Sequence, residues 1–90
     1  MSADRELAGC FGENLARARA RAGISQEELG FRADLHRTEI GLLERGIRLP
    51  RIDTLLKLAG ALEVEPDDLL DGMNWSQGSR SVGQFRIQEF

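Results

Sequence analysis

The 90-residue sequence is poor in the residue types that build disulfides, metal sites and membrane segments. Its one cysteine, Cys10, rules out a disulfide within the chain and suits a reducing compartment. With one cysteine and one histidine, an internal zinc site is nearly excluded, and no metal or cofactor is expected. No apolar run approaches the length of a membrane span, and the N-terminus is too polar for a signal peptide. We therefore expect a cytoplasmic protein without a membrane partner.

Charge is unevenly distributed along the chain, although the formal net charge is only −3. Residues 17–57 hold nine basic and six acidic side chains, whereas residues 58–73 hold five acidic side chains and no basic one. The charge of the local face, rather than the total, decides whether a protein contacts phosphates. The acidic total therefore does not exclude a nucleic-acid ligand.

Apolar residues recur every three or four positions before the tail, which predicts helices. A first helix, which Gly23 ends, has one apolar face that consists of Leu7, Phe11, Leu15, Ala18 and Ala22. A second helix over residues 26–32 begins at a capping box formed by Ser25 and Glu28, with Ile24 and Leu29 as a hydrophobic staple.

Three more helices follow a short break at residues 33–35. The third covers residues 36–45, and Gly46 and Pro50 mark the loop after it. The fourth turns one apolar stripe inward, formed by Ile52, Leu55, Leu56, Ala59 and Leu62. A short fifth helix begins at Pro66 and ends near Gly72. The chain length suits one domain, so we expect an all-α, compact five-helix fold.

The tail differs in composition from the helical part. Residues 74–81 are rich in Ser, Gly, Gln and Asn and predict a linker, while residues 85–88 alternate apolar and polar side chains, a weak strand signal. We expect a helical domain over residues 1–75, and a linker with an extended C-terminal arm over residues 76–90.

The second and third helices form the pair that a protein needs to read a DNA groove. One helix of such a pair crosses the backbone, and the next presents its N-terminal side chains to base edges. Gly30 lets the two helices approach closely. The residues that remain outward at the start of the third helix are the candidate base contacts: His36, Arg37, Thr38 and Gly41.

Arg37 is the strongest of these candidates, because an arginine opposes the helix dipole there and is the side chain that most often binds guanine bidentately. For His36, a poor helix cap, a phosphate contact or solvent exposure remains open, and Glu39 serves either the helix cap or a cytosine. Arg45 and Arg48 suit a loop that lies along the phosphates.

These residues resemble the Cro/repressor (XRE-type) helix-turn-helix family of transcription regulators. The resemblance extends over roughly residues 9–72 and is carried by residues 23–29, Ile40, residues 43–46, Pro50 and residues 55–59. Residues 36–40 and 44–46 are most similar to controller proteins of restriction–modification systems and to small actinobacterial regulators. The resemblance implies a lambda-repressor-like fold.

The resemblance also implies roles for single residues. Gln26 matches a glutamine that binds a phosphate, and Arg37 and Thr38 match base-reading positions. Arg19 and Glu44 match an internal ion pair between the first helix and the end of the third.

Two positions depart from the family pattern. Asp34 stands where glycine is common, which is tolerable because aspartate adopts positive φ more easily than most residues. Arg51 replaces a capping serine or threonine, and we expect it to contact a phosphate instead.

The expected function is sequence-specific binding of double-stranded DNA as a transcription regulator, most simply a repressor at the bacterial nucleoid. One recognition helix reads few base pairs, so we expect a homodimer on a palindromic operator. The apolar residues assigned to its interface are Leu69, Leu70, Met73, Trp75, Phe85 and Ile87. The alternative is an antitoxin or adaptor whose tail binds a protein partner. An enzyme is not expected, since the sequence has no nucleophile–base pair, carboxylate dyad or phosphate-binding glycine loop.

Overall fold

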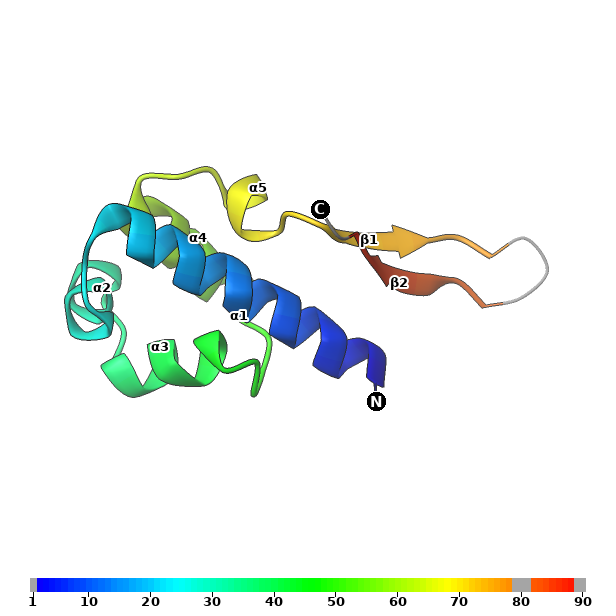
Figure 1. Ribbon diagram of the computed structural model, residues 1–90, viewed down its shortest axis with the longest axis horizontal. Coiled ribbons are helices and arrows are strands. Elements are labelled where there is room, and N and C mark those ends of the chain that lie inside the picture. The colour runs from blue at the N-terminus through cyan, green and yellow to red at the C-terminus, as the bar shows by residue number, and fades with distance from the viewer. Residues whose placement is uncertain (1, 79–81, 89–90) are drawn as a thin grey trace.

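The computed structural model describes residues 2–78 and 82–88. Five helices come first: α1 (Ser2–Ala22), α2 (Gln26–Ala33), α3 (Arg37–Glu44), α4 (Ile52–Leu62) and α5 (Pro66–Leu69). Two antiparallel strands follow, β1 (Met73–Ser76) and β2 (Gln84–Ile87). The helices form one packed body, and the strands project from one end of it (Figure 1). No helix in the described residues carries an apolar run sufficient for a membrane span.

A single apolar core joins the five helices. Its fully buried large side chains are Phe11, Leu15, Leu29, Ile40, Leu43, Leu58 and Leu69. Burial of each such side chain stabilises the fold by about 1.5–3 kcal/mol relative to exposure. Ile40 and Leu43 belong to α3, so the core itself fixes the position of that helix against α1 and α2.

The boundaries of α2 agree with the predicted cap and turn, but the capping box is only half formed. The Ser25 hydroxyl accepts a hydrogen bond from the Glu28 backbone N–H at 3.0 Å. The Glu28 carboxylate instead accepts a hydrogen bond from Arg32, one turn later, at 2.8 Å. Asp34 ends the helix with φ 58°, as its tolerance of positive φ predicted.

The inward face of α4 was predicted partly wrongly. Its buried residues are Thr54, Leu55, Leu58, Ala59 and Leu62. Ile52 and Leu56, which the sequence assigned to the core, are 73% and 56% exposed. Apolar residues occupy more than half of the circumference of this helix, so periodicity alone could not decide which of them face inward.

The tail is a hairpin rather than a linker with a single extended arm. Residues 74–76, predicted as linker, belong to β1 and pair with β2 in the register Met73↔Ile87 to Ser76↔Gln84. The predicted domain boundary at residue 75 therefore falls inside a strand. The description all-α applies only to the helical body, because the two strands add a small sheet.

One face of the hairpin is apolar. Directly paired residues share a face, so Met73, Ile87, Trp75 and Phe85 lie on the same side. Met73 packs against the core, whereas Trp75 and Phe85 meet edge to face in the outer part of the hairpin, with ring centroids 5.0 Å apart. The Gln88 N–H donates to the Gly72 carbonyl at 2.7 Å and closes the base of the hairpin.

The C-terminus of α4 is strained, which leads to a stability prediction. Glu63 caps the helix with φ 57°, a conformation that costs a residue with a Cβ atom but not glycine. We expect Glu63→Gly to raise the free energy of unfolding by about 1 kcal/mol in urea denaturation. Asp34→Gly, at nearly the same φ, should raise the free energy of unfolding by less, because aspartate tolerates positive φ better than glutamate does. A loss of stability in Glu63→Gly would show that the backbone at Glu63 is not strained.

Candidate nucleic-acid interface

The α2–α3 pair is held together by a turn that only glycine permits. A Cβ atom on Gly30 would lie 2.6 Å from the Leu35 carbonyl oxygen and 3.3 Å from the Arg37 nitrogen. A hydrogen bond from the Leu35 N–H to the Gly30 carbonyl, at 2.8 Å, closes this turn. Because Ile40 and Leu43 are buried behind it, α3 presents a fixed outer face beside α2 (Figure 1).

The start of α3 is exposed, as a groove-reading helix requires. Arg37 and Thr38 are both exposed, and no part of the core constrains their side chains. His36 caps the helix, since its Nδ1 accepts from the Thr38 backbone N–H at 3.0 Å. The expectation that His36 caps poorly was wrong, and the cap leaves only Nε2 of the ring for an outside partner. Gly41, one turn after Arg37, offers only backbone.

Arg19 and Glu44 meet in a two-pronged ion pair that ties α1 to the end of α3. Arg19 Nε lies 2.6 Å from one carboxylate oxygen of Glu44, and Arg19 Nη2 lies 3.0 Å from the other. Arg19 Nη1 also donates to the Ile24 carbonyl at 2.9 Å. The two side chains are 22% and 8% exposed. The pair therefore ties the end of α3 to α1 from a partly buried position.

Gln26 joins this cluster. Its Nε2 donates to the Glu44 carboxylate at 2.9 Å, so the amide is half-buried between α2 and α3. Partial burial raises the pKa of Glu44, but hydrogen bonds from Arg19 and Gln26 outweigh that effect, and the net pKa lies below its ordinary value. Glu44 is thus held ionised. A phosphate contact by Gln26 would use the donors left over: the second N–H of Nε2 and the backbone N–H at the start of α2.

The arginines expected to bind phosphates lie around the end of α3 and the start of α4, and all are exposed: Arg45, Arg48 and Arg51. Arg48 Nη2 lies 2.9 Å from Glu39 Oε1, and Arg51 Nε lies 3.3 Å from Asp53 Oδ1. The Glu39 carboxylate is therefore paired with Arg48, and it is neither a helix cap nor a free side chain on the outer face of α3. Exposed pairs of this kind contribute about 0–1 kcal/mol, so a phosphate can displace the carboxylate.

The residues assigned to a dimer interface do not form one surface. Leu69 is fully buried in the core of its own chain and cannot contact a partner, so that assignment was wrong. Leu70 and Met73 are half-buried against the same core. Trp75, Phe85 and Ile87 lie on the apolar face of the hairpin, where a dimer contact stays a prediction.

Sequence reasoning missed a set of exposed apolar residues in the α3–α4 loop and on α4. Its members are Ile47, Leu49, Ile52 and Leu56. Ile52 and Leu56 lie to one side of the line defined by Leu55, Leu58 and Leu62, but the broad apolar face of α4 left no sequence signal that excludes them from the core.

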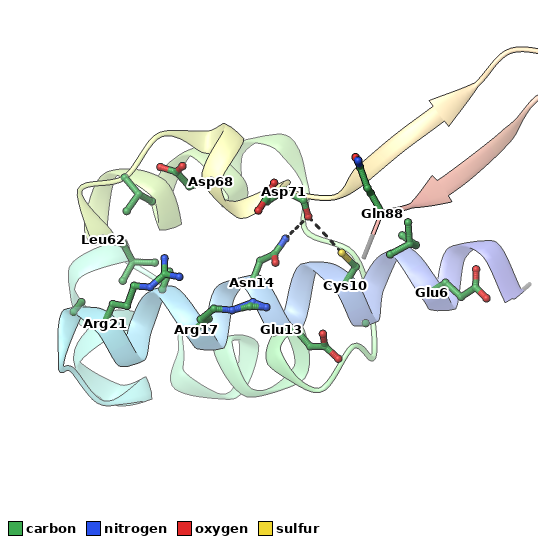
Figure 2. A pocket seen from close by; sticks show the side chains of 15 residues that line it. Glu6, Cys10, Glu13, Asn14, Arg17, Arg21, Leu62, Asp68, Asp71 and Gln88 are labelled. Atoms are coloured by element: carbon green, nitrogen blue, oxygen red, sulfur yellow. Dashed lines mark hydrogen bonds between the residues drawn. The ribbon is translucent and has the colours of Figure 1, made fainter. Parts of the chain in front are cut away.

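A groove runs along the outer face of α1, opposite α3, and is closed at one end by the base of the hairpin (Figure 2). Asn14 Nδ2 donates to the carbonyls of Leu69 and Asp71 at 3.0 and 2.9 Å, and Cys10 Sγ lies 3.6 Å from the Asp71 carbonyl oxygen. Burial is the main cause that raises the pKa of the Cys10 thiol. These contacts anchor the turn after α5 to α1, and in the described residues no three His, Cys, Asp or Glu side chains gather as a metal site would need.

A helix-turn-helix held rigidly on a small helical core, with an exposed basic and polar helix start, defines a DNA-binding regulator. The family model described as Helix-turn-helix matches residues 15–69, so the chain belongs to the Helix-turn-helix family. This confirms the predicted family and function: the protein is a DNA-binding transcription regulator. The antitoxin or adaptor alternative is not favoured.

Two curated relatives are similar over most of their length. The control protein C.BamHI of Bacillus amyloliquefaciens is 45% identical over 62 residues, which cover 68% of this chain and 76% of the relative. The uncharacterized HTH-type transcriptional regulator y4dJ of Sinorhizobium fredii is 41% identical over 59 residues, 66% of this chain and 77% of the relative.

Two solved structures show the same fold. The restriction–modification controller protein C.AhdI of Aeromonas hydrophila superposes with a TM-score of 0.67 at 42% identity, over 69% of this chain and 94% of that one. The P22 c2 repressor, solved with a synthetic operator, superposes with a TM-score of 0.64 at 34% identity, again over 69% and 94%. The hairpin lies beyond the residues that the family model matches.

Proposed function

We propose that the protein is a non-enzymatic repressor that binds a palindromic operator as a homodimer and inserts α3 into the major groove. The observation that carries the proposal is the exposed start of α3, with Arg37 and Thr38 outward on a helix that Ile40 and Leu43 fix to the core. The similar P22 c2 repressor was solved in complex with a synthetic operator, which supports operator DNA as the ligand. Binding to chromosomal DNA would place the protein in the cytoplasm at the nucleoid.

The side chains divide into base contacts and phosphate contacts. Arg37 donates two hydrogen bonds to O6 and N7 of a guanine, and Thr38 contacts a neighbouring base or its thymine methyl group. His36 reaches a base or phosphate through Nε2. The contacts to the backbone come from Arg45, Arg48 and Arg51 and from the amide groups at the start of α2, where Gln26 is the first residue.

The relatives suggest the kind of regulation. C.BamHI and C.AhdI are named as control proteins, the latter of a restriction–modification system. We infer that this protein is also a controller, and that it occupies an operator whose two half-sites are about 34 Å apart, one for each recognition helix.

Arg37→Ala tests the proposal. We expect the variant to lose about 1–3 kcal/mol of discrimination per half-site and to relax the preference at one base pair, with an unchanged circular-dichroism spectrum. Specific and non-specific affinities, measured by fluorescence anisotropy, give the discrimination.

Two control variants accompany it. Arg37→Lys keeps the charge but loses the planar guanidinium that binds a base with two hydrogen bonds. It should therefore retain the attraction to phosphates and lose most of the base preference. Arg21→Ala removes an arginine from the groove on the outer face of α1 (Figure 2). It should change neither the specific nor the non-specific affinity for DNA. If Arg37→Ala kept the full sequence preference, α3 would not be the reading helix.

A further inference from the structure

The outer face of α4 carries an apolar stripe that nothing in the described chain covers. Ile52 is 73% exposed and Leu56 is 56% exposed, and Gly60 follows them at the same spacing on an exposed part of the helix. Residues four apart lie on one side of a helix, so these three positions form a line about 12 Å long. Apolar stripes of this kind on a small domain mark an interaction surface.

Gly60 distinguishes this stripe from an ordinary apolar face. A glycine inside a helix is less favourable than alanine, so its presence needs a reason. Elsewhere the fold supplies one: a Cβ atom on Gly12 would lie 2.5 Å from the Leu43 carbonyl oxygen. A Cβ atom on Gly60 would have no heavy atom within 4 Å. Gly9 on α1 has the same open space, but only Gly60 continues a line of exposed apolar residues, so a close approach by another molecule at this stripe accounts for it.

We propose that α4 packs antiparallel against α4 of a second copy of this chain, with the two-fold axis at Leu56. Ile52 and Gly60 are each four residues from Leu56, in opposite directions. A two-fold axis at Leu56 therefore places Ile52 on the partner's Gly60, and Gly60 under the partner's Ile52. The bulky side chain fills the space that the glycine leaves, twice, and Leu56 meets its own copy on the axis. This stripe is self-complementary, as a two-fold interface must be.

Charge at the two ends of α4 selects the same orientation. Arg48 and Arg51 lie before its first residue, and Glu63 and Glu65 lie after its last, all four exposed. Antiparallel packing brings the basic end of each helix to the acidic end of the other, whereas parallel packing would bring like charges together. The helix dipoles favour the antiparallel arrangement as well. Exposed ion pairs stabilise weakly, so the apolar contact carries the affinity and the charges set the direction.

The inference names the partner surface of the dimer proposed above, and its role in operator binding rests on that proposed function. The interface itself is argued from α4 alone, so it is testable without DNA. Sedimentation equilibrium of the free protein measures the dimer, and binding to a single half-site measures the helix-turn-helix separately.

Gly60→Leu is the decisive variant. A leucine at an exposed helical position with open space around it leaves the monomer folded. In the dimer it occupies the space of the partner's Ile52, and we expect the dimer dissociation constant to rise about 10–100-fold. Gly9→Leu, at another helical glycine without a heavy atom near its Cβ position, is the matched control and should dimerise as the wild type does.

The exchange variant Ile52→Ala with Gly60→Leu moves the large side chain to the other side of the contact and should bring the constant back to within about tenfold of the wild type. Half-site binding should be unchanged in all variants. A monomeric wild type, a Gly60→Leu variant that dimerises normally, or an exchange variant that stays dissociated would each overturn the proposal. A dimer that is lost only on removal of residues 79–90 would assign the interface to the hairpin and overturn it as well.

Discussion

The affinity of this protein for its operator is expected to fall about 10³–10⁵-fold when monovalent salt rises from about 50 to about 200 mM. A dimer that neutralises about 6–10 phosphates releases the counterions condensed on them, and the gain from that release shrinks as salt rises. The side chains that supply this effect are the exposed arginines around the end of α3: Arg45, Arg48 and Arg51. The acidic total opposes it little, because charges beyond about 10 Å are screened at these salt concentrations.

Single substitutions show where this salt dependence arises. Arg45→Ala should lower the slope of log affinity against log salt by about two for the dimer, one phosphate for each subunit. Arg21→Ala should leave the slope unchanged, because Arg21 lines the groove on the outer face of α1, as Leu62 and Asp68 do (Figure 2). A flat salt response of the wild type would mean that the basic middle of the chain does not face DNA.

Loss of either partner of the Arg19–Glu44 pair is expected to lower the free energy of unfolding by about 3–5 kcal/mol. Arg19→Met leaves a carboxylate that is 8% exposed with only Gln26 as a donor, and Glu44→Met leaves the guanidinium with only the Ile24 carbonyl. The double replacement strands no charge, so it should cost much less than the sum of the single ones. Urea denaturation of the four proteins gives the coupling energy.

Glu28 and Arg32 form the matched control for this cycle. Their pair spans one turn of α2 with both side chains 45% exposed, and its coupling should not exceed about 0.5 kcal/mol. Additive losses at Arg19 and Glu44, as at a surface pair, would contradict a structural role for this partly buried pair.

The same pair predicts an acid dependence of stability. The pKa of Glu44 is lowered in the fold, so its contribution is present above the unfolded value of about 4.3 and is lost as pH falls through the folded value. The difference in stability between the wild type and Glu44→Met should therefore be constant near neutral pH and shrink below about pH 4. A difference that stayed constant down to pH 2 would assign the loss in Glu44→Met to packing alone.

The sequence predicted the helical body well because local chemistry decides where its helices begin and end. Ser25 caps α2, Pro66 opens α5, and Gly23 and Gly46 adopt positive φ after α1 and α3. Each of these signals acts within one or two turns of chain, so no tertiary contact can override it easily. The order of the helices then follows from short connections and one shared core.

The features that the sequence predicted wrongly or missed are set by contacts between distant parts of the chain. The facing of Ile52 and Leu56 is set by how α4 sits on α2 and α5, which the apolar content of α4 does not reveal. Strand β1 was hidden because Asn74 and Ser76 lie on the polar face of the hairpin and resemble linker residues. Glu39 and Arg48 meet across the turn after α3, at a spacing that helix periodicity does not describe.

Selection of bound fragments from a random pool of double-stranded DNA tests the central claim most directly. If the protein reads DNA as a dimer through the start of α3, the enriched sites are inverted repeats with half-site centres about 10 base pairs apart, and each half-site has a guanine whose preference disappears in Arg37→Ala. Enrichment of no common sequence, or of a single asymmetric site unaffected by Arg37→Ala, would contradict the account.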